Sequence, residues 1–389
     1  MFSTEEINSA KQYKYNGIDE SIFAKLFLRK YWDSCMKFIP MTVAPNTITL
    51  IGFLFEVFSF VLSYVYSDGL KKELPWFVCF LNGICLFVYQ TLDNLDGRQA
   101  RRTKMSSPLG QFFDHGCDAI TGVCEIMKIA ATYNMGCELK TFILLMLLGT
   151  GFFLASYEEY VTHRFYLGKI NAPDEGLLLL SISHIVVSFF PSLKHYFTTS
   201  IASYLILITF SVTIAMIIFN VLKSSIHSLQ TFIRGVVAII PCLISASVFS
   251  FIVYKNPEIV QNKFFLMSSG FLLQYGSQML IVSHVVKRSA WRLFDLSTLL
   301  MWGSALLYFV PQLNAKEYFW NVYFAAIIFT ILVFDLRVIH GLSKGLGIPV
   351  FRVVGSTASP SRTTPSINHI KLFKQKIDDT IRRFRAVAH

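Results

Sequence analysis

The chain has 389 residues, of which 53% are hydrophobic and only 15% are charged. Soluble domains carry about 25% charged residues, so this composition excludes an ordinary soluble domain and indicates an integral membrane protein. The formal net charge is +11, and we expect the excess of basic residues to meet lipid headgroups rather than nucleic acid. The seven cysteines form no CxxC pair, so we interpret them as buried apolar residues rather than disulfides or zinc ligands.

The start of the chain carries no targeting signal that we recognise. Its first twenty residues lack an apolar core, so we expect the N-terminus to stay in the cytosol. The next stretch, 22–39, mixes aromatic and basic residues, which is typical of a helix lying at the membrane interface.

Ten segments are apolar and long enough to cross a bilayer, for which about 20 residues are needed. The third is weakened by charged residues and the fifth is short, so eight or nine spans are the alternatives. The ten segments lie near residues 47–67, 75–95, 111–132, 141–158, 176–193, 198–222, 232–254, 264–286, 294–313 and 318–338.

Basic residues favour the cytosolic side in this arrangement, both between the spans and at the two ends of the chain, as the positive-inside rule requires. After a flexible linker at 355–366, apolar residues recur at helical spacing between lysines and arginines. This pattern predicts a basic amphipathic helix on anionic lipid, with a solvated coil as the alternative. The predicted fold is therefore an all-α polytopic membrane protein.

We divide the chain into four parts. Residues 1–40 form the cytosolic or interfacial N-terminal segment, and 41–222 form a catalytic transmembrane bundle. Residues 223–340 add further transmembrane helices, and 341–389 form a basic cytosolic tail.

Charged residues gather in one stretch beside the second and third spans, 93-DNLDGRQARRTKMSSPLGQFFDHGCD-118. Asp93 and Asp96 share one helix face, as do Asp114 and Asp118, and we expect a loop over 97–110 to return the chain antiparallel. Four facing carboxylates repel one another unless a cation lies between them. Oxygen ligands favour Mg²⁺ or Mn²⁺, and two ions bridged by Asp93 and Asp114 are compatible with this set.

The same stretch suits a phosphorylated ligand. Gly97 and Ala100 have small side chains, so they leave space for a ligand beside the carboxylates. Arg101 can bind phosphate oxygens through two N–H groups. Arg102 and Lys104 either bind phosphate as well or contact lipid headgroups. The alternative for the aspartates is structural ion pairing with the neighbouring arginines.

The complete spacing, Asp93-x2-Asp96-Gly97-x2-Ala100-Arg101-x8-Gly110-x3-Asp114-x3-Asp118, resembles the signature of the CDP-alcohol phosphotransferase family. The DHGCD core and the upstream 44-APNTITLIG-52 resemble its eukaryotic choline/ethanolamine branch. The resemblance implies transfer of a phospho-alcohol from a CDP-alcohol to the hydroxyl of diacylglycerol, with release of CMP.

The resemblance also implies roles for individual residues. Asp93, Asp96 and Asp114 would hold one metal ion, and Asp118 would join Asp93 and Asp114 at the second. The residues bordering the nucleotide would be Asn46, Gly97, Ala100, Arg101 and Gly110.

Two residues compete as the base that accepts the proton of the attacking hydroxyl. His115 has an unperturbed pKa of about 6.5, which suits general-base catalysis, whereas a metal-bound Asp118 is a weak base. A histidine that only orients Asp114 is the further alternative. In the connection 157–176, residues Glu158, Glu159, His163, Asp174 and Glu175 could border the headgroup site. Of these, Glu175 matches a Pro-x-Glu-Gly ending of the choline/ethanolamine branch, and we expect it to attract the amine or assist the base.

The expected partners are CDP-choline or CDP-ethanolamine, diacylglycerol and membrane lipids, and the oligomeric state, a homodimer included, is open. The resemblance implies the endoplasmic reticulum, with the Golgi as an alternative, and an active site facing the cytosol. Two other functions compete: a cation- or proton-coupled transporter that uses the aspartates, and an inactive family member that serves as a scaffold.

Overall fold

The structure, a computed structural model, describes residues 2–194, 211, 214–215, 217–219, 221–222, 228–311 and 318–353. In this part of the chain, seven helices are long and apolar enough to cross a membrane, which confirms the predicted all-α membrane fold. Six of them are α3 (Pro45–Tyr66), α4 (Trp76–Thr103), α6 (Leu139–Thr162), α10 (Leu229–Lys255), α11 (Lys263–Val285) and α14 (Phe319–Leu346). The seventh joins a π-helical turn (Ala172–Gly176) to α7 (Leu177–Phe189).

Helix α5 (Pro108–Thr132) coincides with the third expected span. It carries too many charged residues to count among the seven apolar helices. The charge is neutralised inside the bundle. The Lys128 ammonium pairs with Glu56 of α3 and lies 2.6 Å from Glu125, which in turn lies 3.0 Å from His184 of α7. Because Lys128 and Glu125 each lie beside a group of opposite charge or a hydrogen-bond partner, burial of this part of α5 is tolerated.

Two other expected segments differ from full spans. The range 294–313 contains α12 (Leu296–Leu306), followed by a 3₁₀ turn (Leu307–Phe309); eleven α-helical residues rise only about 16 Å, so α12 by itself is too short to cross a bilayer. Most of the range 198–222 lies outside the described residues. The linker at 355–366 and the amphipathic helix beyond it also lie outside them.

The expected loop at 97–110 is shorter than predicted. Helix α4 continues to Thr103 and ends at Lys104, whose φ of 58° is left-handed. Helix α5 then begins at Pro108, and the Ser107 hydroxyl accepts a hydrogen bond from the Gly110 amide at 3.1 Å. Serine before a helix and proline in its first turn are strong start signals, so Gly97, Ala100 and Arg101 lie on α4 and not in a loop.

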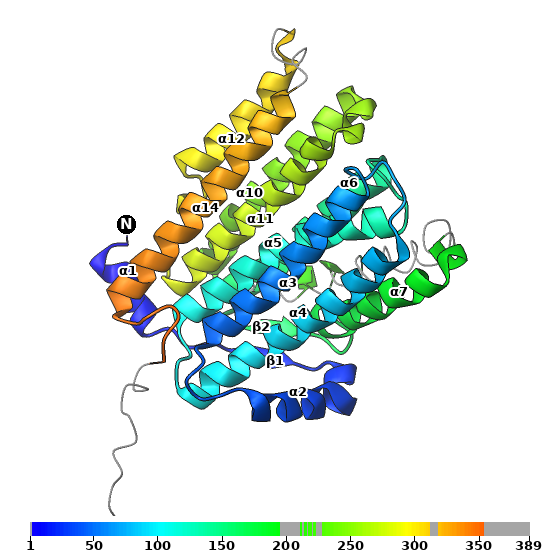
Figure 1. Cartoon of the computed structure of the whole chain (residues 1–389). Helices are drawn as coiled ribbons and strands as arrows, with labels where there is room; N and C mark the ends of the chain where they lie inside the picture. Colours follow the sequence, from blue (N-terminus) through cyan, green and yellow to red (C-terminus); the bar gives the residue numbers. More distant parts are fainter. Residues whose placement is uncertain are drawn as a thin grey trace, which may run out of the picture.

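The N-terminal segment runs along one end of the bundle. It contains α1 (Thr4–Lys11), a π-helical turn (Ala24–Leu28), α2 (Arg29–Cys35) and a 3₁₀ turn (Met36–Phe38), so the stretch 22–39 is largely helical, as expected. Strand β1 (Gly17–Asp19) pairs in parallel with β2 (Phe165–Leu167), a small sheet that the sequence did not predict. In Figure 1, α1 lies beside the end of α14, and β1 and β2 lie between α2 and the helix ends of the bundle.

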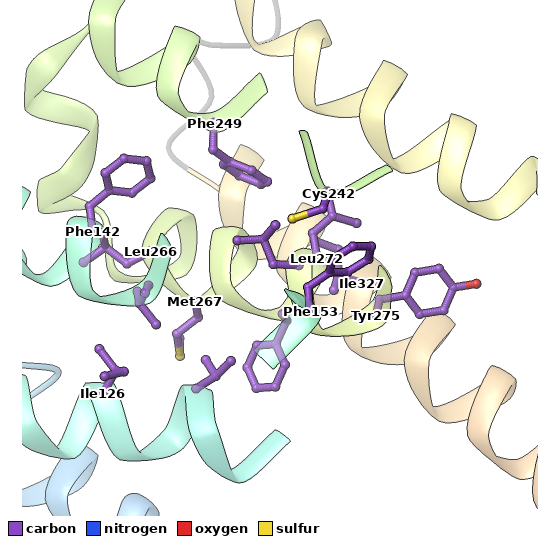
Figure 2. Close-up of a cluster of buried hydrophobic side chains, with 14 of the residues drawn as sticks. Ile126, Phe142, Phe153, Cys242, Phe249, Leu266, Met267, Leu272, Tyr275 and Ile327 are labelled. Atoms are coloured by element: carbon purple, nitrogen blue, oxygen red, sulfur yellow. The ribbon is translucent and has the colours of Figure 1, made fainter. Parts of the chain in front are cut away.

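Helix α11 forms the centre of the apolar core, since almost all of its residues are buried. It packs against α5, α6, α10 and α14. Figure 2 shows Leu266, Met267 and Leu272 of α11 among aromatic side chains from α6 and α10, including Phe153 and Phe249. Of the helices after residue 228, α11 and α14 pack directly on α5, which carries the second half of the charged stretch.

Candidate active site

Three of the four carboxylates predicted to bind metal come together where α4 and α5 meet, and Asp96 is not part of this group. One carboxylate oxygen from each of Asp93, Asp114 and Asp118 lies within 4.8 Å of the others. One oxygen each of Asp93 and Asp114 is buried without a hydrogen-bond partner. Unpaired buried carboxylate oxygens at this spacing fit the oxygen donors that a divalent cation requires, so these residues can hold one.

Hydroxyl groups orient the remaining carboxylate oxygens. The Tyr89 hydroxyl donates a hydrogen bond to Asp118, and Thr121 donates to the Tyr89 oxygen at 3.0 Å. The Thr49 hydroxyl of α3 donates to Asp96. Such outer contacts hold metal-binding side chains in place. Neither residue was assigned a role from the sequence: nothing in its local pattern marks Tyr89, and Thr49 lies in the segment 44-APNTITLIG-52 without a predicted partner.

The arginines of α4 have different surroundings. Arg98 pairs with Asp33 and lies over the Trp32 ring, 5.3 Å from its centroid. Arg102 donates to the Met36 and Ile39 carbonyls. Among the described residues, neither of these two arginines pairs with the four aspartates.

Arg101 is exposed and takes part in none of the hydrogen bonds or ion pairs found in the described part of the chain. A guanidinium without a protein partner, one helix turn beyond the carboxylates, can bind an anionic ligand. The structural ion pairing considered as an alternative for the aspartates is therefore not seen among the described residues.

The residues expected to border the nucleotide are grouped at the same end of the bundle. The Asn46 amide donates to the Val350 carbonyl at 3.0 Å, and a Cβ placed on Gly110 would lie 3.7 Å from the Asn46 side-chain oxygen. A Cβ on Gly97 would lie 3.5 Å from Arg101. These are ordinary contact distances, so packing within the protein does not require glycine at either position. The space that each glycine leaves for a ligand explains its presence.

His115 is buried, with its ring 5.2 Å from the ring of Phe165, centroid to centroid. It joins no hydrogen bond among the described residues. The ring nitrogens are therefore free to contact a substrate.

Glu175 lies in a different setting. Its carboxylate accepts hydrogen bonds from the Ser21 hydroxyl at 2.6 Å, the Phe23 amide at 2.9 Å and the Asn171 amide at 2.9 Å. It thereby ties the N-terminal segment to the turn before α7. Asp174 is also buried, and Gln90 of α4 donates to its carbonyl at 2.7 Å. The catalytic or headgroup role of Glu175 stays a prediction.

A second polar cluster surrounds Glu159, near the end of α6. Its Oε1 accepts a hydrogen bond from Gln111 at 2.8 Å and from the Tyr13 hydroxyl at 3.4 Å, and His284 lies 3.6 Å away. The His163 ring stacks on His284, with centroids 5.6 Å apart. The sequence named Glu159 and His163 as candidates, but their partners come from three distant parts of the chain.

Comparisons with known proteins agree with this site. A family model described as CDP-alcohol phosphatidyltransferase matches residues 42–215. Choline/ethanolaminephosphotransferase 1 of Arabidopsis thaliana is 44% identical over 173 residues, which are 44% of each chain. Uncharacterized CDP-alcohol phosphatidyltransferase class-I family protein 3 of Dictyostelium discoideum is 42% identical over 204 residues, which are 52% of this chain and 51% of that protein.

One relative aligns over a longer range. Uncharacterized CDP-alcohol phosphatidyltransferase class-I family protein 2 of Dictyostelium discoideum is 33% identical over 289 residues, which are 73% of this chain and 70% of that protein. By contrast, the chain spans only about half the length of the relatives that are 42–44% identical.

Proposed function

Because the chain belongs to the CDP-alcohol phosphatidyltransferase family, we propose that it transfers a phospho-alcohol from a CDP-alcohol to diacylglycerol. The donor is CDP-choline, CDP-ethanolamine or both, and the products are the corresponding phospholipid and CMP. The name of the Arabidopsis relative, a choline/ethanolaminephosphotransferase, supports this choice of alcohol.

The observation that carries the proposal is the group of three carboxylates from α4 and α5, within 4.8 Å of one another. We propose that Asp93, Asp96, Asp114 and Asp118 hold Mg²⁺ or Mn²⁺, which when bound neutralises the diphosphate and the departing CMP. Arg101 binds phosphate oxygens.

The nucleotide is bordered by residues that leave space beside the carboxylates. Gly97 and Ala100 do so from α4, Gly110 from α5, and Asn46 from the first turn of α3.

The acceptor hydroxyl loses a proton when its oxygen attacks phosphorus. We assign this proton to a nitrogen of His115, which makes no hydrogen bond within the described residues and lies next to Asp114 in sequence. Asp118 already accepts a hydrogen bond from Tyr89, and Glu175 accepts three. Both are therefore less suited to the role, although they stay the alternatives.

The proposal extends to the setting of the reaction. The catalytic part is the bundle of residues 41–222, its active site faces the cytosol where CDP-alcohols are made, and the membrane is the endoplasmic reticulum.

An assay with radiolabelled donors tests the function. The full-length protein in lipid nanodiscs is mixed with diacylglycerol and labelled CDP-choline or CDP-ethanolamine, with and without EDTA. We expect labelled phospholipid from at least one donor, none in EDTA and none from Asp114→Asn. Asp68→Asn, an exposed aspartate outside the site, serves as the control and should keep full activity. Robust product in EDTA, or from Asp114→Asn, would overturn the proposal.

The same preparation tests the competing functions. A transporter that uses intramembrane carboxylates is expected to spread them along a path through broken helices, whereas here they cluster where α4 and α5 meet. All four aspartates of the signature are present, so nothing favours an inactive scaffold. Absence of labelled product with both donors would reopen these two functions.

A further inference from the structure

Beside the carboxylate cluster lies a buried acid whose charge the proposed reaction does not yet use. Glu159 is 2% exposed, and its three polar neighbours all converge on one oxygen, Oε1. None of the hydrogen bonds or ion pairs among the described residues reaches Oε2, and that atom is not among the fully buried unpaired ones. One carboxylate oxygen is therefore left for a ligand.

No cationic side chain neutralises Glu159 permanently. Within the described part of the chain, its only basic partner is His284, at 3.6 Å, and no lysine or arginine pairs with it. Burial of a carboxylate without a fixed cation is costly, so a cationic ligand at this position would be stabilised.

Two aromatic side chains, Tyr13 and His284, contact the same acid. The Tyr13 ring meets the His284 ring edge-on at 5.6 Å, and the His163 ring stacks on His284. Phe165, two residues further along the chain in β2, contacts His115. Faces of aromatic rings attract cations, above all quaternary ammonium groups.

Tyr15 links this cluster to the metal-binding aspartates. A Cβ on Gly17 would lie 2.4 Å from the Tyr15 hydroxyl, so the Tyr15 ring folds back over Gly17. Half of Tyr15 is exposed, so the residue is only partly buried. This burial raises the pKa of Tyr15, and the negative charges of Glu159 and Asp114 raise it further. The hydroxyl thus lies within electrostatic reach of both carboxylate groups.

The N-terminal segment holds Tyr13 and Tyr15 in place at three points. Glu6 accepts a hydrogen bond from Arg288 at 2.6 Å, β1 pairs with β2, and Glu175 binds Ser21. This segment lies outside residues 42–215, which match the family model. Tyr13 and Tyr15 therefore come from outside the part of the chain that matches the family model.

We propose that Glu159 and the rings of Tyr13, Tyr15 and Phe165 form the subsite for the cationic amine of the donor's alcohol. The inference rests on the proposed function and names a specificity-determining group for it. When the diphosphate of the donor lies at the aspartates, its amine is only a few bonds beyond the transferred phosphorus. His115, which contacts Phe165, lies on the same face of α5 as Gln111, which donates a hydrogen bond to Glu159. The amine replaces the cation that the protein itself does not supply.

Binding without turnover tests the subsite. Full-length protein is titrated calorimetrically with CDP-choline, and separately with CDP-glycerol, a neutral analogue, in Mn²⁺ and without diacylglycerol. Glu159→Gln should weaken CDP-choline binding about 10- to 100-fold, as expected for loss of a buried charge partner, and leave CDP-glycerol binding within about twofold. Glu20→Gln is the matched control. This substitution removes a carboxylate from the N-terminal segment, where Glu20 accepts a hydrogen bond from the Tyr166 hydroxyl at 2.9 Å. It should change neither the CDP-choline affinity nor the CDP-glycerol affinity.

Tyrosine variants provide a second readout that does not alter the carboxylate. Tyr15→Leu should weaken CDP-choline binding about 2- to 20-fold, whereas Tyr15→Phe, which keeps the ring face, should not. If Glu159→Gln leaves the ratio of the two affinities unchanged, or if the wild type binds both donors equally, the subsite is wrong while the proposed function stands. If the wild type binds neither donor, the proposed function fails as well.

Discussion

We expect the crowding of three carboxylates to make the stability of this protein depend on a metal ion. One oxygen from each of Asp93, Asp114 and Asp118 lies within 4.8 Å of the others. At that distance and an effective dielectric of about 20, two unit charges repel by about 3.5 kcal/mol. Three such pairs amount to about 10 kcal/mol, which is as large as the whole free energy of unfolding of many proteins, about 5–15 kcal/mol. This figure is an upper bound, because a carboxyl group that takes up a proton escapes the repulsion.

Thermal unfolding with and without metal measures this effect. A cation that binds the folded state at about 100 times its Kd adds about 2.7 kcal/mol, so the melting temperature of the wild type in Mg²⁺ should exceed that in EDTA by several degrees. Asp114→Asn removes two of the three repulsive pairs. We expect this variant to melt higher than the wild type in EDTA and to gain little from Mg²⁺.

The control for this experiment is Asp68→Asn, since Asp68 forms an exposed pair with Lys72 at 3.4 Å. Exposed pairs contribute about 0–1 kcal/mol, so this variant should follow the wild type in both conditions. Two results together would refute the argument. The melting temperature of the wild type would be the same in Mg²⁺ and in EDTA, and the Asp114→Asn variant would be less stable than the wild type in EDTA. The aspartates would then not form a repulsive site that a cation stabilises.

Three further predictions concern other parts of the molecule. Lys128→Met should destabilise the fold by about 3–5 kcal/mol, because it leaves Glu56 without its buried cation, and adding Glu56→Gln should recover part of the melting temperature; no recovery would contradict the pairing. Arg101→Ala should raise the KM for the CDP-alcohol about 10-fold or more and leave the KM for diacylglycerol unchanged, and equal changes in both would argue against a phosphate contact. Cysteines introduced by Ser106→Cys and Lys72→Cys lie at opposite ends of α4 and should be labelled from opposite sides of sealed microsomes, measured against the wild-type background; labelling from the same side would show that α4 does not span.

The grouping of the carboxylates that we propose to bind metal was predictable from the sequence because their geometry is local. Spacings of three and four residues place Asp93 with Asp96, and Asp114 with Asp118, on single helix faces whatever the rest of the fold does. A short connection then brings the two helices together. The apolar segments were predictable for a similar reason, since the length needed to cross a bilayer depends only on the thickness of the hydrocarbon region.

The loop at 97–110 shows the limit of such local signals. Glycine, serine and proline in that stretch predicted a long connection, yet α4 continues to Thr103. Tertiary contacts hold the extra turn, since Arg102 and Gln99 donate to carbonyls of the segment 36–43. Packing of this kind overrides local propensity.

Long-range contacts decided the rest. Charge made α5 a weak candidate for a buried helix, and only Glu56 of α3 and His184 of α7 explain why Lys128 and Glu125 can lie inside the bundle. Likewise, the sequence around Glu159 does not predict its contacts with Tyr13 and His284. Those side chains reach Glu159 only through the packing of the N-terminal segment and α11. Local spacing therefore determined which carboxylates can bind a metal ion, whereas the surroundings of each buried charge depend on contacts between distant segments, which only the folded chain brings together.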